Sequence, residues 1–238
     1  MLNPKNYKLE IKQRANEYRN ANSYNNAVKE YLSAILLDKT DFESYLGLGI
    51  SYKYLNRVEK AIEVLKKAQE LNKNNAEVYY ELGICNIILG QMCQAMCCLV
   101  KCIQLDKENL NAQIQLGIVH ETLGEEDMAL KIYKKIMETN PSFVKAYEYA
   151  SFLLMDMEQY NEAGKILSRL IKVFPECIHA YLGMGICYEK LDNISSAKRC
   201  YRKFLSLSDN NVQTDMVKEK LNKLGISTPA KHLHLLNV

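Results

Sequence analysis

The fold is decided by residues 76–109, which read AEVYYELGICNIILGQMCQAMCCLVKCIQLDKEN. The next segment of equal length, 110–143, repeats the layout of a small residue and an alanine twelve positions later. Working outward in both directions, this pair recurs at one constant interval, the length of the quoted segment. The alanines are Ala27, Ala61, Ala95, Ala129, Ala163 and Ala197, and the small residues are Ala15, Gly49, Gly83, Gly117, Ser151 and Gly185. A fixed period of this length indicates one supersecondary structure stacked repeatedly.

Each repeat predicts two amphipathic helices. Aromatic residues such as Tyr45 and Tyr79 stand four positions before the small residue, and apolar residues follow each alanine after four and seven positions. These are helical intervals, and a small residue at a helix crossing lets two backbones approach closely. Asn56, Gly90 and Gly124 tolerate left-handed geometry and are expected to end first helices. Without a strand-like alternating run, the chain is predicted to be all-α.

This pattern resembles the tetratricopeptide repeat family over residues 8–211. The resemblance implies a right-handed α-solenoid of six helix-turn-helix repeats plus a C-terminal capping helix. The expected segments are an N-terminal cap, 1–7; six repeats, 8–41, 42–75, 76–109, 110–143, 144–177 and 178–211; a capping helix, 212–225; and a C-terminal tail, 226–238. Departures are local: Ile11 and Arg14 replace the aromatic and the leucine in the first repeat, and Gln113 replaces the aromatic in the fourth.

Composition and charge limit the classes of function. The net charge of +3 comes from interspersed acids and bases, which argues against a dedicated nucleic-acid-binding protein. The N-terminal residues carry no apolar signal region, and no run approaches the roughly 18 apolar residues of a membrane span. We therefore expect a cytoplasmic protein without a membrane segment.

Four cysteines, Cys93, Cys97, Cys98 and Cys102, lie on the predicted second helix of the third repeat. At helical spacing they spread over about half of the circumference, so four of them cannot bind one zinc ion. The pairs Cys93 with Cys97 and Cys98 with Cys102 could each supply two ligands. Buried cysteine also behaves as a small hydrophobic residue, and Cys102 occupies a core position of the repeat. We favour packing and expect no metal and no cofactor.

The sequence contains no recognisable catalytic motif. His120 stands at a packing position of the repeat, and His179, His232 and His234 have no nucleophile or carboxylate at a meaningful spacing. No glycine-rich loop that could bind a phosphate is present. The sequence therefore predicts a protein that is not an enzyme.

A binding site is expected on the concave face, which the first helices line in this family. Two positions of each first helix predict an apolar ridge along a groove, with mixed charges on its flanks. Its residues are Leu46, Ile50, Tyr80, Ile84, Ile114, Ile118, Phe152, Leu182 and Ile186. Such a stripe suits an extended or helical apolar peptide. Adjacent first helices also touch one another, so the alternative is that this ridge is packing between repeats.

Two family functions are tested by the residues themselves. In the clamp of co-chaperones that bind chaperone carboxylates, Lys12 and Asn16 match, but Gly47, Glu77 and Glu81 follow, and the two acids would repel a carboxylate. The asparagine ladder of the sugar-transferring member is absent. The prediction is a scaffold for a protein or peptide ligand, with a chaperone-like escort or a regulatory subunit of an enzyme complex as alternatives. Self-association through the solenoid ends or the apolar residues 232–238 also stays open.

Overall fold

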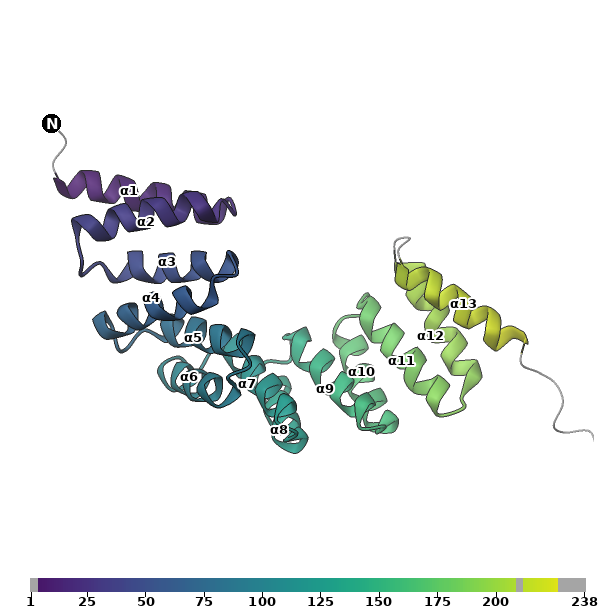
Figure 1. Ribbon diagram of the computed structural model, residues 1–238. Coiled ribbons are helices and arrows are strands. Elements are labelled where there is room, and N and C mark those ends of the chain that lie inside the picture. Colours follow the sequence, from purple (N-terminus) through teal and green to yellow (C-terminus); the bar gives the residue numbers. More distant parts are fainter. Residues whose placement is uncertain (1–3, 209–211, 227–238) are drawn as a thin grey trace, which may run out of the picture. The chain divides into compact units, whose positions relative to one another are not determined.

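The computed structural model describes residues 4–208 and 212–226 (Figure 1). Over these two ranges the chain forms thirteen α-helices and no strand, which confirms the predicted all-α repeat fold. The first helices of the repeats are α1 (Pro4–Asn20), α3 (Phe42–Tyr54), α5 (Ala76–Ile88), α7 (Leu110–Thr122), α9 (Val144–Asp156) and α11 (Ile178–Lys190). The second helices are α2 (Tyr24–Leu37), α4 (Val58–Leu71), α6 (Met92–Leu105), α8 (Glu126–Thr139), α10 (Tyr160–Val173) and α12 (Ile194–Leu207), and α13 (Val212–Ile226) follows them.

A left-handed residue separates the two helices of every repeat. The residues are Asn22, Asn56, Gly90, Gly124, Glu158 and Asp192, with φ angles between 56° and 73°. They recur at the same interval as the periodic alanines and in step with them. Asn56, Gly90 and Gly124 have the geometry that the sequence predicts, whereas Glu158 holds it without a favourable residue type.

The core runs along the stacked helices and is built around the periodic alanines. All six of these alanines have 0% exposed surface. At the small position, a β-carbon on Gly49 would lie 2.6 Å from Leu65 Cγ, and one on Gly185 would lie 2.3 Å from Tyr201 Cε1. These distances are too short for real atoms, so the glycines are needed where a second-helix side chain packs onto the first-helix backbone.

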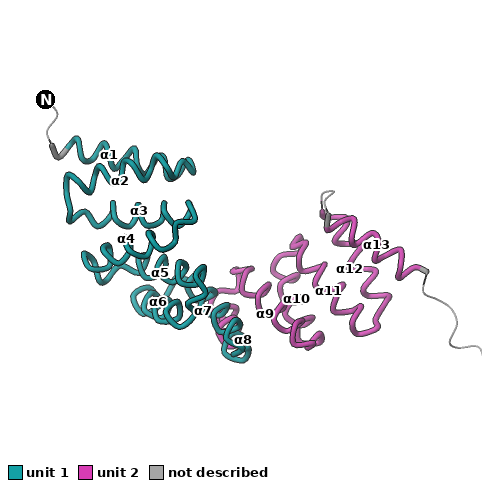
Figure 2. Tube along the Cα trace, in the orientation of Figure 1, with its two compact units in different colours: residues 1–129 teal, residues 130–238 magenta. Residues whose placement is uncertain are grey.

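Two compact units divide the chain, Met1–Ala129 and Leu130–Val238 (Figure 2). In the first unit each helix from α1 to α7 packs against the next one along the chain, and the first helices α1, α3, α5 and α7 also contact one another in succession. In the second unit the same neighbour packing runs from α9 to α13, with α9 also contacting α11. Each unit is therefore held together by contacts that are local in sequence.

The ends of the described chain are helical. Helix α1 begins at Pro4, so residues 4–7 of the predicted N-terminal cap continue into the first helix. In α13, Val217 is fully buried in one cluster with Phe204, and Leu221 packs against that cluster. Residues 232–238, through which self-association stays open, lie outside the described residues. No helix of the described ranges is long and apolar enough to cross a membrane.

Candidate functional site

The predicted groove residues divide between the two compact units, and those of the N-terminal unit form what we call the first-helix face. We define it as the two predicted positions on α1, α3, α5 and α7. Its residues are Lys12, Asn16, Leu46, Ile50, Tyr80, Ile84, Ile114 and Ile118. Because α1, α3, α5 and α7 contact one another in succession, these positions form a continuous row across four helices.

The apolar residues of this face differ in their exposure. Leu46 and Ile50 are 7% exposed and Ile114 is 2% exposed, so these three contribute mainly to packing between repeats. Leu46 and Ile50 lie in one cluster with Val78 on the next first helix. Tyr80, Ile84 and Ile118 are half-buried and keep part of their apolar surface accessible. These members, on α5 and α7, are the part of the face available to a ligand.

The predicted residues of the C-terminal unit are arranged differently. Phe152 on α9 is 51% exposed. Leu182 and Ile186 are half-buried and pack against the terminal cluster that contains Phe204 and Val217. Part of the surface of Leu182 and Ile186 is thus used in stabilising the last repeat and α13.

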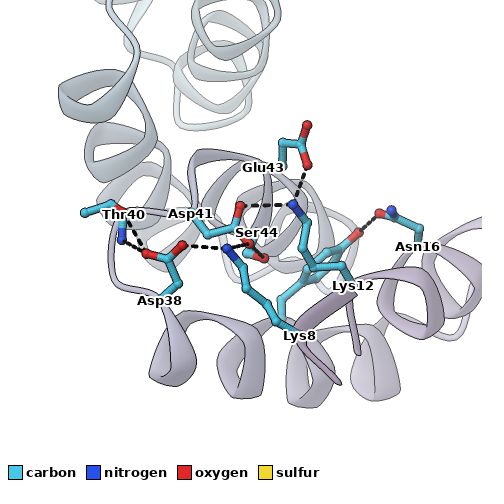
Figure 3. Close-up of polar contacts among 9 residues, drawn as sticks. Lys8, Lys12, Asn16, Asp38, Thr40, Asp41, Glu43 and Ser44 are labelled. Carbon is cyan, nitrogen blue, oxygen red and sulfur yellow. Dashed lines mark hydrogen bonds and ion pairs between the residues drawn. The ribbon is translucent and has the colours of Figure 1, made fainter. Parts of the chain in front are cut away.

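The polar end of the first-helix face is occupied by contacts within the chain (Figure 3). Lys12 Nζ donates a hydrogen bond to Asp41 Oδ1 at 3.1 Å and also pairs with Glu43. Asn16 Oδ1 accepts a hydrogen bond of 2.7 Å from the Tyr31 hydroxyl. Both residues that match the carboxylate clamp therefore already have partners, which adds to the argument against that clamp.

A second lysine joins α1 to the turn before α3. Lys8 Nζ lies 2.5 Å from Asp38 Oδ2 and 3.4 Å from Asp41 Oδ2 (Figure 3). The hydrogen bond from Lys8, together with those from Thr40, holds the pKa of Asp38 well below its usual value. Burial alone would raise the pKa of Asp41, but the hydrogen bonds from Ser44 and Lys12 outweigh burial and lower it. Both carboxylates are thus held in the charged form.

An ion pair connects α3 to α5 next to the apolar residues. Lys53 Nζ lies 2.5 Å from Glu81 Oε2, and the two side chains are only 11% and 10% exposed. Burial raises the pKa of the neighbouring Tyr80 hydroxyl, and the charge of Glu81 acts in the same direction. Glu81 therefore neutralises a cation of the chain itself, and Tyr80 presents an uncharged phenol.

The cysteines and His120 differ in burial and in their partners. Among the residues that the structure describes, no group of three or more His, Cys, Asp or Glu side chains could hold a metal ion. Burial raises the pKa of Cys85 and of Cys102 to about 11, so both thiols stay protonated at neutral pH. Cys93 and Cys97 are exposed on α6. His120 Nδ1 lies 2.6 Å from Glu125 Oε2 across the turn between α7 and α8.

Two surface grooves were not predicted from the sequence, because both involve second helices and the predicted groove involved first helices only. One, of about 470 Å³, lies in the N-terminal unit and is lined by α4, α5 and α6, with Cys97 and Cys98 among its residues. The other, of about 800 Å³, lies in the C-terminal unit and is lined by α10, α11 and the turn after α11. The sequence does contain a signal for the second groove: Lys165 and Arg169 are four residues apart and so lie on one side of the same helix.

Family comparisons agree with the repeat pattern. The model described as TPR repeat matches residues 51–85, and the model described as Tetratricopeptide repeat matches residues 76–109, 110–143 and 178–211. Together these matches cover residues 51–143 and 178–211, more than half of the chain. Curated proteins give no match to the sequence.

Solved structures share the architecture at low sequence identity. PilW, a widely conserved type IV pilus biogenesis factor, is 18% identical over 89% of this chain and 98% of its own, with a TM-score of 0.74. A tetratricopeptide repeat protein from Parabacteroides merdae ATCC 43184 is 16% identical over 92% of this chain and 86% of its own, with a TM-score of 0.72. YrrB, a TPR protein with an unusual peptide-binding site, is 21% identical over 79% of this chain and 97% of its own, with a TM-score of 0.59. At these identities the likeness concerns the fold.

Proposed function

Because the chain belongs to the tetratricopeptide repeat family, whose fold is a general scaffold for protein interactions, we propose that it is a non-enzymatic scaffold. Its ligand is a peptide segment or helix of a partner protein. The binding site is the first-helix face of the N-terminal unit, centred on Tyr80, Ile84 and Ile118.

One observation carries this proposal: Tyr80, Ile84 and Ile118 remain half-buried on two first helices that contact each other. Lys12 and Asn16, at the α1 end of the face, and Glu81, next to Tyr80 in sequence, are already paired within the chain, so they add little attraction for a charged ligand. What the face offers is apolar surface. An extended or helical segment with apolar side chains at regular spacing fits such a surface.

The expected affinity follows from the apolar area. Burying about 400 Å² of apolar surface, counted on the face and the ligand together, at about 25 cal/mol per Å² contributes on the order of 10 kcal/mol at most. Loss of translational freedom and ordering of the ligand cost a comparable amount. Because a micromolar dissociation constant corresponds to about 8 kcal/mol of net binding free energy, we expect binding weaker than micromolar.

The test combines capture with site-specific crosslinking. Tagged wild-type protein and the double variant Ile84→Asp, Ile118→Asp are used to capture partners from native lysate. A photoreactive benzoylphenylalanine at position 118 should crosslink to the partner that the wild type retains and the double variant loses. The double variant should lose the partner because binding would bury the two introduced carboxylates, which is unfavourable.

Val100 supplies the matched control, because it is an apolar residue of α6 that is 39% exposed. Val100→Asp should retain the partner, and benzoylphenylalanine at position 100 should not crosslink to it. Far-ultraviolet circular dichroism checks that each variant keeps its helices. A partner that the double variant retains, with crosslinks equally strong from positions 100 and 118, would contradict the proposal.

A further inference from the structure

The C-terminal unit carries a groove that the proposed function does not use. This cavity of about 800 Å³ is lined on one side by α10, including Lys165, Arg169 and Lys172. On the other side it is lined by α11 and the following turn, including Tyr188 and Leu191. We call it the basic groove.

Positive charge is concentrated on the helices that flank α11. Helices α10 and α12 both pack against α11, and Figure 1 shows the three in succession. They carry seven lysines and arginines against one acid, Glu162, a net charge of +6. The whole chain has a net charge of only +3. Of the other second helices, α2, α4 and α8 are balanced and α6 carries +1, so among the second helices the excess is confined to α10 and α12.

Most of these cations have no carboxylate partner. Lys165 Nζ lies 2.5 Å from Glu162 Oε1, which uses the single acid of the two helices. The six others form no ion pair with any residue in the ranges 4–208 and 212–226; they are Arg169, Lys172, Lys198, Arg199, Arg202 and Lys203. Arg169 and Lys172 are exposed and three residues apart, so they share one side of α10 at the groove.

Part of the lining of the groove is apolar. Met184 and Leu191 contribute thioether and aliphatic surface, and Tyr160 and Tyr188 contribute aromatic rings. Gly164 adds space because it has no side chain; a β-carbon there would lie 4.0 Å from Met184 Sδ, an ordinary contact distance. The groove therefore combines a cationic rim with room for an apolar side chain.

We propose that the basic groove binds an acidic peptide segment that carries one apolar anchor residue. The acidic side chains pair with Arg169 and Lys172, which line the groove, while the anchor covers Met184 and Leu191. Charge complementarity supports this ligand, because Arg169 and Lys172 line the groove without a carboxylate partner and repel each other until anions approach. The anchor adds buried apolar area, which a charged rim alone cannot supply.

A peptide fits this groove better than a nucleic acid does. Nucleic acids have no aliphatic side chain to bury against Met184 and Leu191. The chain as a whole is nearly balanced in charge, unlike proteins that follow a phosphate backbone over a long distance. A single-stranded RNA is therefore the competing ligand in the test.

The test measures fluorescence anisotropy with defined probes and the full chain. The first probe is a labelled octapeptide with Asp and Glu around a central Leu-Phe pair. The second replaces its acids with Asn and Gln, the third replaces Leu-Phe with Ser-Ser, and the fourth is octauridylate RNA. We expect the first probe to bind with a dissociation constant on the order of 10 μM, weakening as salt rises, and the other three at least about tenfold more weakly.

Charge-reversed variants locate the site. Arg169→Glu with Lys172→Glu should weaken the first probe by about tenfold or more, since two attractive contacts become repulsive. Lys131→Glu with Lys135→Glu makes the same charge change on exposed positions of α8 and should alter binding by less than about twofold. Equal losses in both double variants would show non-specific attraction and overturn the proposal. Tighter binding of the RNA than of the first probe would also overturn it.

A pair of substitutions at Gly164 tests the anchor separately from the charges. Gly164→Phe fills the space beside Met184 and should reduce the affinity of the first probe to that of the Ser-Ser probe. Gly164→Ala leaves most of that space and should preserve the affinity of the first probe. If Gly164→Phe, still helical by circular dichroism, binds the first probe as the wild type does, the anchor does not lie in the groove and the proposal fails.

Discussion

At the scale of single residues, the fold depends on positions where any side chain would overlap with a packed neighbour. A β-carbon on Gly185 would meet the Tyr201 ring at 2.3 Å, and that ring is fully buried. The same change at Gly164 would meet only Met184 Sδ at 4.0 Å. Both glycines lie inside helices, where alanine is intrinsically preferred by about 1 kcal/mol. Their environments therefore give the same substitution opposite effects.

Gly185→Ala should lower the free energy of unfolding by about 2 kcal/mol, because overpacking against Tyr201 exceeds the gain in helix propensity. Gly164→Ala should raise the free energy of unfolding by about 0.5–1 kcal/mol. Urea unfolding followed by circular dichroism measures both. Two changes of the same sign would mean that helix propensity alone governs these positions.

The sequence predicted the small positions and the alanines because each is imposed by a repeated steric contact. It predicted only part of the turns. Asn56 and Gly90 are residue types that favour left-handed backbone, but Glu158 is not, and only the period of the repeat identifies it. Local preference and stacking thus act together, and stacking decides where the residue type is unfavourable.

At the scale of helices, α1 is held to the start of α3 by charge as well as by packing. Lys12 bonds to Asp41, whose side chain is 6% exposed, while Glu43, the other partner of Lys12, is 73% exposed. Because the folded protein lowers the pKa of Asp41, Asp41 contributes stability at a pH above its ordinary pKa. This contribution is lost as the pH falls through the lowered pKa.

Asp41→Asn should destabilise the protein by about 1–2 kcal/mol at pH 7, because it removes a charged hydrogen-bond acceptor from a buried position. Asparagine is also a favourable residue at the start of a helix, so the variant removes the negative charge while leaving the helix start favourable. The difference between variant and wild type should shrink as urea unfolding is repeated from pH 7 down to pH 3. Glu43→Gln, at the exposed partner, should have a smaller effect; an equal effect would contradict the role of burial.

The candidate binding residues were less predictable than the helices that carry them. Helical spacing placed Ile50, Ile84 and Ile114 on one row, but their exposure depends on how closely successive first helices pack. Ile50 and Ile114 are buried while Ile84 is half-buried. The basic groove could not be predicted from the periodicity of one helix, because its lining combines residues of α10 and α11.

At the scale of the whole molecule, stability is transmitted from neighbour to neighbour. The helix contacts within each unit join elements that are adjacent or next but one in sequence. A solenoid of this kind can lose structure at one end while the rest stays folded. The effect of a substitution on local stability should therefore decrease with the number of helices between the substituted residue and the helix whose stability is measured.

Hydrogen exchange followed by mass spectrometry measures this directly. In Asp41→Asn at pH 7, amides of α1, α2 and α3 should exchange faster than in the wild type. Amides of α11 and α12 should exchange at unchanged rates, because the contacts within each unit join only helices that are adjacent or next but one in sequence. A uniform acceleration along the chain would instead indicate a single cooperative transition.

The N-caps of α5 and α7 make the length of the chain adjustable. Asn75 Oδ1 accepts the hydrogen bond of Val78 N, and Asn109 Oδ1 accepts that of Ala112 N, one full repeat later. Removing residues 76–109 would join Asn75 to Leu110 with an asparagine still at the start of the next helix. Duplicating the same segment would preserve that junction equally well. The architecture thus allows evolution or design to change the number of repeats one at a time while the junction between repeats stays the same.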